Sequence, residues 1–278
     1  MVNPVDIHTS GRVKVKTIKL YLCGLKSYHV DLGLPATAFS DVRLERVILG
    51  IKGEYAEPGR RARSTLTRDC LLQVLRRLRQ PTYKNATLRV AFTLAFAGFL
   101  RVGEFTYERA DLNLGPNFRN WFLTRSSVRI SRDQSHMSLY LPASKRDPFR
   151  QGVEIIIAAS RDEACPIAAM VNLQNMDRRR NAQDPLFTAD NHLLLPFTRR
   201  CVVQSLRTLA TVAGVGGGSW NGYSFRRGTA TWVAEVGIPE HQIQALGWWS
   251  SSAYRSNIYT SREDRITLSR SFQHPQPS

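Results

Sequence analysis

The chain has 278 residues, 42% of them hydrophobic, which is enough for one large folded domain with a smaller partner. Its 39 Lys and Arg against 22 Asp and Glu give a net charge of +17, and such a field attracts polyanions, above all nucleic acid. No signal peptide opens the chain and no apolar run approaches the roughly 20 residues of a spanning helix, so we expect a soluble, intracellular protein with no membrane partner.

Two short amphipathic helices are predicted near the N-terminus. Apolar residues recur at helical spacing from Ile18 to a stop at Gly33-Leu34-Pro35, and again from about Asp41 to Ile51. Two helices cannot close a hydrophobic core alone. Residues 1–56 are therefore interpreted as part of a small helical domain.

A basic linker is predicted over residues 57–65. It combines turn-forming residues with the arginines Arg60, Arg61 and Arg63. Arginines in a linker can follow a DNA backbone, and each phosphate neutralised steepens the salt dependence of binding. The alternative is a solvated charge run.

The next stretch predicts two helices that lead to a conspicuous arginine. The first begins at Leu66 with Thr67 as its N-cap and is closed by Pro81, and the second, from Ala86 to Leu100, is apolar almost all round. Arg101 follows directly. Since a guanidinium in apolar surroundings keeps its proton, Arg101 needs an anionic partner, either Glu104 or an external anion.

The period then changes from helical to alternating, which predicts a small antiparallel sheet. Three strands are expected, over Trp121–Ile130, His136–Leu141 and Gly152–Ile157. The polar loop 142–152 contains Lys145, and a solvated loop lysine is its simplest interpretation. Together with further helices over 166–176 and 198–214, the fold class is mainly α with a small antiparallel β-sheet (α+β).

Residues 222–260 combine a basic pair, an apolar helix and an aromatic tail. A helix is predicted from Phe225 to Val236 and a second, after Gly237-Ile238-Pro239, to Gly247. Arg226 and Arg227 therefore lie at a helix start, where unpaired backbone N–H groups favour a phosphate. Alternatively, both arginines are simply solvated.

The order Gly-x-Ser-Phe-Arg-x-Gly-x-Ala-Thr, Gly-Ile-Pro, and Gln-Ala-Leu-Gly-Trp-Trp-Ser-Ser-x-Ala-Tyr resembles the last third of the tyrosine recombinase (phage-integrase-like) catalytic domain, in the forms of fungal mobile elements. Gly-x-x-Arg-x-x-Glu around Arg101 and Ser-Lys-x-Asp-Pro-Phe-Arg-Gln-Gly around Lys145 resemble two more of its motifs. The resemblance implies a catalytic domain over 66–278, preceded by a core-binding domain whose first helices are missing.

The resemblance also implies roles for individual residues. Arg101, Lys145 and Arg226 take the family's catalytic positions. Tyr223 stands where the family has histidine, so an acid/base candidate of ordinary pKa about 6.5 becomes one of about 10. Trp248 fills a position that is His or Trp in the family. It either donates a hydrogen bond through its indole N–H or is simply a core residue. The implied DNA contacts are Lys19, Lys26, Arg60, Arg61, Arg63, Arg146 and Arg227.

The nucleophile is the main departure from the family. Counting from Gly247, or from Tyr254, places the nucleophilic tyrosine at Asn257, and an amide is no nucleophile. Tyr259 is the nearest replacement. Two residues correspond to roughly 200° of rotation on a helix, so Tyr259 would face away unless the segment is irregular.

The family reaction is metal-free phosphoryl transfer through a 3′-phosphotyrosyl link to DNA. We expect duplex DNA as the partner, self-assembly on it as a dimer or tetramer, nuclear localisation, and no cofactor. The four separated cysteines are expected to be reduced thiols that bind no zinc. Three functions stay open: an active recombinase using Tyr259, an inactive DNA-binding derivative, and an unrelated RNA-associated protein.

Overall fold

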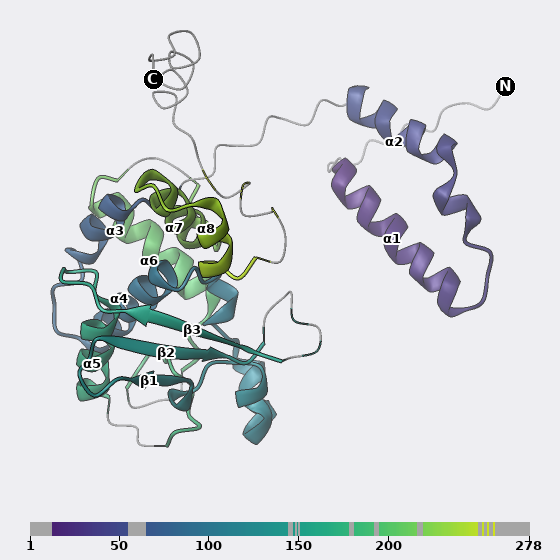
Figure 1. The fold of residues 1–278 in the computed structure, drawn as a ribbon. Coiled ribbons are helices and arrows are strands. Elements are labelled where there is room, and N and C mark those ends of the chain that lie inside the picture. Colours follow the sequence, from purple (N-terminus) through teal and green to yellow (C-terminus); the bar gives the residue numbers. More distant parts are fainter. Residues whose placement is uncertain are drawn as a thin grey trace, which may run out of the picture. The chain divides into compact units, whose positions relative to one another are not determined.

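The polypeptide divides into two units, 1–61 and 62–278, in the computed structural model (Figure 1). The structure describes residues 13–54, 65–143, 147, 149, 151–177, 181–191, 195–215, 219–249, 252, 255 and 258.

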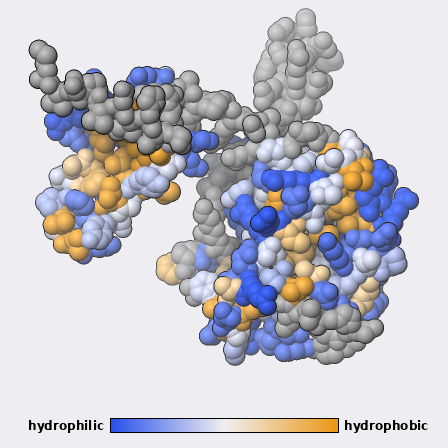
Figure 2. Space-filling model, turned by 180° about the vertical axis from the view of Figure 1, so that it is seen from behind, coloured by the Kyte–Doolittle hydropathy of each residue, from blue (hydrophilic) through white to orange (hydrophobic). Residues whose placement is uncertain are grey.

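The first unit is a pair of helices with little core of its own. Helix α1 (Val15–Asp31) is followed by the 3-10 turn η1 (Thr37–Ser40) and helix α2 (Val42–Glu54). The ring of His29 packs edge-on against Phe39, which fastens the connection between the helices. Among the described residues of this unit only Val15 and Ile48 are buried hydrophobic residues, and Figure 2 shows other hydrophobic side chains gathered on its surface.

The second unit is built around helix α4 (Tyr83–Ala97), which is apolar on nearly every side and packs against helices α5 (Pro166–Met176) and α7 (Ser224–Glu235). Helix α3 (Arg68–Leu75) precedes α4, and helix α6 (Arg199–Val212) packs against α3. The last α-helix of the described part of the chain is α8 (Glu240–Leu246). The apolar side chains of α3 to α7 form one large core, and Ile243 of α8 belongs to a second, smaller cluster with Phe99, Ala230 and Trp249.

A three-stranded antiparallel sheet covers part of this core (Figure 1). Its order is β1 (Val128–Ile130), β2 (His136–Leu141) and β3 (Val153–Ala158). Met137 pairs with Ile157, and both are buried because every second side chain of a strand points to the same face. The predicted fold class, mainly α with a small antiparallel sheet, is confirmed.

Several element boundaries differ from the sequence-based prediction. The strand expected from Trp121 begins only at Val128, because the hydroxyl of Ser127 accepts from the backbone N–H of Thr124 and closes the 3-10 turn η4 (Arg125–Ser127). The 3-10 segment η3 (Arg109–Asn120) was not predicted. Thr67 is the N-cap of α3, as predicted, and its hydroxyl accepts from the N–H of Cys70.

Within the described ranges, no helix combines the length and the apolar character needed to cross a membrane. The same residues contain no cluster of three or more histidine, cysteine or acidic side chains that could hold a metal ion.

Candidate functional site

Arg101 lies just beyond the C-terminal end of α4, as the N-cap of the 3-10 turn η2 (Val102–Glu104). Glu104 holds it with both carboxylate oxygens. One accepts from the backbone N–H of Arg101 at 2.6 Å and the other accepts from its guanidinium Nη1 at 2.5 Å. The Arg101 side chain keeps 16% of its surface exposed, whereas that of Glu104 keeps 5%, so the ion pair fixes the arginine but leaves part of it reachable.

Arg226 occupies the first turn of α7 and is only 1% exposed. Its Nη1 donates to the carbonyl oxygen of Phe99 at 2.7 Å, and its Nη2 donates to that of Gly247 at 2.6 Å. Its guanidinium carbon lies 4.2 Å from the ring centroid of Trp249. Burial of a guanidinium is costly unless hydrogen bonds and aromatic faces receive it, and both do so here.

The two carbonyl groups that accept hydrogen bonds from Arg226 lie at the C-terminal ends of α4 and α8, and these two helix ends have the same backbone hydrogen-bond pattern. After α4 the backbone N–H of Leu100 donates to Ala95, and after α8 the N–H of Trp249 donates to Gln244. Such ends require a left-handed residue, usually glycine, but here the residues are Phe99 (φ 53°) and Trp248 (φ 47°). A left-handed bulky residue costs roughly 1–2 kcal/mol, so local strain is concentrated around Arg226.

Trp248 brings the two arginines together. The guanidinium carbon of Arg226 lies 4.8 Å from the centroid of the Trp248 ring, and that of Arg101 lies 6.0 Å from the same centroid. The two guanidinium groups therefore cannot be further apart than the sum of these distances. The indole N–H of Trp248 is buried and has no hydrogen-bond acceptor among the described residues. Two cations and an unused donor thus share one small region.

The other predicted site residues are distributed unevenly. Tyr223, the N-cap of α7, is 39% exposed, and Arg227 is partly buried on the first turn of the same helix. In the first unit, Lys19 and Lys26 are exposed on α1, and Lys26 donates to the hydroxyl of Ser40 at 3.1 Å. Seven predicted residues lie outside the described part of the chain: Arg60, Arg61, Arg63, Lys145, Arg146, Asn257 and Tyr259.

Sequence reasoning missed the immediate surroundings of Arg226. Phe99, Gly247 and Trp249 contact its guanidinium, yet none of them carries a charge or a reactive group. One signal was available. An apolar helix followed by Gly98-Phe99, and a second helix followed by Gly247-Trp248, both indicate helix ends at which backbone carbonyl groups are left to accept hydrogen bonds.

Comparison with known proteins gave matches at the level of structure only. No protein-family model and no curated protein matches the chain. A structure of the XerH site-specific recombinase bound to palindromic difH substrate, a post-cleavage complex, matches with a TM-score of 0.54 at 12% identity, over 78% of this chain and 54% of that one. The XerA recombinase structure matches with a TM-score of 0.52 at 14% identity, over 96% of this chain and 78% of that one.

The chain has the tyrosine recombinase fold. A pre-cleavage complex of XerH with difH substrate matches in the same way, with a TM-score of 0.50 at 11% identity, over 97% of this chain and 74% of that one. In the post-cleavage complex the matched region spans about half the length of XerH (54%). At these identities the likeness is one of fold.

Proposed function

We propose that this protein is a DNA-binding tyrosine recombinase-like protein that takes one phosphate of a DNA duplex at the Arg101, Trp248 and Arg226 site. The observation that carries the proposal is the convergence of the two arginines, from distant parts of the chain, on the Trp248 ring. The net charge of +17 supports it, because a basic protein attracts the DNA backbone at long range.

The chemistry of the site suits a phosphodiester. A partly exposed guanidinium can donate two parallel hydrogen bonds to phosphate oxygens, and the indole N–H of Trp248 can donate a third. Arg226 is covered and the rings of Trp248 and Trp249 both lie against its guanidinium, so a phosphate reaches it only if these rings move. The left-handed backbone of Trp248 favours such a rearrangement, because leaving that conformation releases strain.

Strand breakage and rejoining form the second part of the proposal. A tyrosine oxygen would attack the DNA phosphorus and lose its proton to solvent, the bond to the 5′ oxygen would break, and the Lys145 ammonium would give its proton to that leaving oxygen. Arg101 and Arg226 would stabilise the charge on the non-bridging oxygens. Asn257 at the nucleophile's spacing makes this step inefficient in the chain as it stands, and Tyr259 is the remaining candidate nucleophile.

A nicked suicide duplex tests this part, since the released fragment diffuses away and traps any covalent complex. We expect little or no covalent adduct from the unmodified chain and more from Asn257→Tyr, with a further gain when Tyr223→His restores a group that titrates near neutral pH. An adduct formed by the unmodified chain and abolished by Tyr259→Phe would instead make Tyr259 the nucleophile of a working recombinase.

Partners and location follow from the same proposal. Self-assembly on DNA as a dimer or tetramer, nuclear localisation and kinship with fungal mobile elements are parts of it that rest on the sequence motifs. An RNA-associated function is the alternative from another class. Competition between a duplex and a folded RNA of equal length separates the two, because recognition of DNA predicts preference for the duplex.

A further inference from the structure

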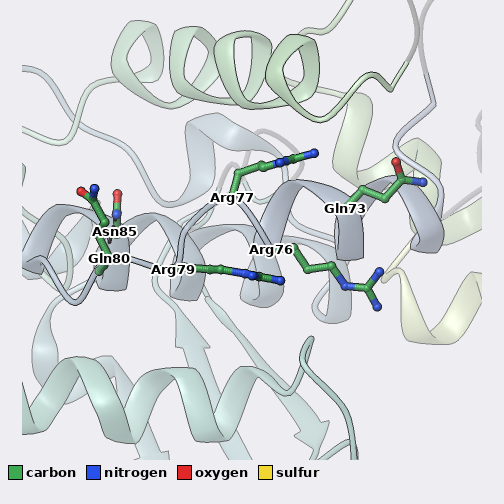
Figure 3. A pocket seen from close by; sticks show the side chains of 6 residues that line it. All are labelled: Gln73, Arg76, Arg77, Arg79, Gln80 and Asn85. Carbon is green, nitrogen blue, oxygen red and sulfur yellow. Dashed lines mark hydrogen bonds between the residues drawn. The ribbon is translucent and has the colours of Figure 1, made fainter.

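A basic hollow lies where α3 ends and α4 begins. It has a volume of about 740 Å³ and is lined by Gln73, Arg76, Arg77, Arg79, Gln80 and Asn85. Figure 3 shows the three arginine side chains between Gln73 at one end and Gln80 and Asn85 at the other. The lining consists of guanidinium and carboxamide side chains alone.

Side chains of α4 hold the backbone that carries these arginines through hydrogen bonds to its carbonyl groups. Arg89 of α4 donates from Nη2 to the carbonyl oxygen of Leu75 at 2.6 Å and to that of Leu78 at 3.4 Å. Helix α3 ends at Leu75, earlier than the predicted stop at Pro81, and Arg89 binds carbonyl groups at this end. Burial lowers the pKa of Arg89, and the charge of Glu163 opposes that shift. Asn85 adds a bond from its side-chain amide to the carbonyl oxygen of Gln80 at 3.2 Å.

The positive charge of the hollow is only partly neutralised within the described residues. Arg76 pairs with Glu163 at 3.2 Å, with both side chains more than half exposed. Arg77 and Arg79 are exposed and have no acidic partner in the part of the chain that the structure describes. Two guanidinium groups are therefore presented to solvent on a fixed backbone, beside carboxamides that can both donate and accept hydrogen bonds.

The hollow is separate from the Arg101 site. Asn85 belongs to the first turn of α4, whereas Arg101 follows its last turn, and 15 helical residues extend over roughly 20 Å. One phosphate cannot contact both places.

We propose that the hollow binds the phosphodiester backbone of a nucleic acid, as a second contact region apart from the Arg101 site. Arginine, glutamine and asparagine side chains supply many of the contacts to DNA phosphates. An acidic protein partner fits less well, because the centres of protein interfaces are enriched in aromatic residues and the lining has none. This proposal goes beyond the proposed function and does not depend on strand exchange.

Modification of arginine by a dicarbonyl reagent, read by mass spectrometry, locates the contact. We expect a saturating duplex of about 30 base pairs to slow modification of Arg77 and Arg79 several-fold, in the unmodified chain and equally in Arg109→Gln, which changes an exposed arginine of η3 outside both regions. Protection of these two arginines by a Glu-rich peptide but not by the duplex would overturn the proposal in favour of a protein partner. Absence of protection by the duplex would also overturn it.

Salt titration of duplex binding gives the second readout. The double variant Arg77→Gln/Arg79→Gln should lower the slope of log affinity against log salt by about 2, since each phosphate contact contributes about 0.9. The matched control Arg119→Gln/Arg132→Gln removes the same charge from exposed arginines outside the hollow. Equal slopes for the two double variants would contradict the proposal. A failure of the Arg101 site would show instead as unchanged affinity in Arg101→Gln.

Discussion

Arg226 donates a hydrogen bond of 2.7 Å to the carbonyl oxygen of Phe99, which precedes it by 127 positions in the chain. A second bond of 2.6 Å joins it to Gly247, so one guanidinium connects the ends of α4 and α8 through the start of α7. The arginine is thus a structural element before any ligand arrives. Its removal should affect folding as well as binding.

Arg226→Lys tests this structural role. A single ammonium group cannot reproduce the fork that reaches two carbonyl oxygens, so one buried acceptor loses its partner. We expect the free energy of unfolding to fall by about 2 kcal/mol, the usual cost of a lost hydrogen bond to a charged group. Denaturant titration measures it. Arg227→Lys on the same turn is the control, and an equal loss in both variants would contradict the structural role of Arg226.

Gly228 permits the close approach of α7 to residue 66. A Cβ atom at position 228 would lie 1.8 Å from the carbonyl oxygen of Leu66, whereas one at Gly103 would meet nothing within 4 Å. Gly228→Ala should therefore destabilise the fold by about 1–3 kcal/mol or more, as overpacking does. Gly103→Ala should change stability little. Thermal unfolding of the two variants decides, and indistinguishable midpoints would show that the close approach is wrong.

The indole N–H of Trp248 is a buried donor without an acceptor in the described structure. Trp248→Phe keeps an aromatic ring beside both arginines but removes this donor. If the N–H binds a phosphate oxygen, duplex affinity should fall about tenfold, the equivalent of roughly 1.4 kcal/mol. Trp121→Phe, at a half-exposed ring, is the matched control. Unchanged affinity in Trp248→Phe would assign the ring to packing alone.

The free energy of unfolding is expected to depend on pH through the carboxyl group of Asp162. Burial raises its pKa, but hydrogen bonds from Ser160 and Ala164 and the charge of Arg68 outweigh this, so the pKa of Asp162 is below its ordinary value of 3.8. A lowered carboxyl pKa contributes stability that is present above the ordinary pKa and is lost as pH falls through the lowered one.

The corresponding experiment compares unfolding between pH 6 and pH 2 in the unmodified chain and in Asp162→Asn. We expect the unmodified chain to lose stability below about pH 4, and the variant to lose less over the same range. Asp69→Asn, an exposed carboxyl of α3, serves as the control. Identical pH profiles for Asp162→Asn and the unmodified chain would refute the role of Asp162.

Local patterns predicted the fold class and the N-cap Thr67, because capping and hydrophobic period depend on neighbours in the chain. They did not predict element boundaries at which other side chains bind the backbone. Helix α3 ends at Leu75, where Arg89, 14 residues further on, donates to the carbonyl oxygen of Leu75. The strand expected from Trp121 is replaced in part by a turn that hydroxyl groups close.

The candidate site was predictable to a similar extent. The motifs identified Arg101, Arg226 and Trp248, which the structure brings together. They gave no indication that Arg226 is buried, since its burial depends on backbone carbonyl groups of Phe99 and Gly247 and on the Trp249 ring. Carbonyl acceptors belong to every residue, so the sequence does not mark them.

Duplex affinity measured against salt concentration, for the unmodified chain and for Arg101→Gln, tests the central claim most directly. The account predicts that log affinity falls by several units per tenfold rise in salt, and that Arg101→Gln binds more weakly with a slope smaller by about 1. Arg109→Gln, an exposed arginine of η3, controls for the loss of charge. A slope near zero, or equal binding by Arg101→Gln and Arg109→Gln, would contradict phosphate binding at this site.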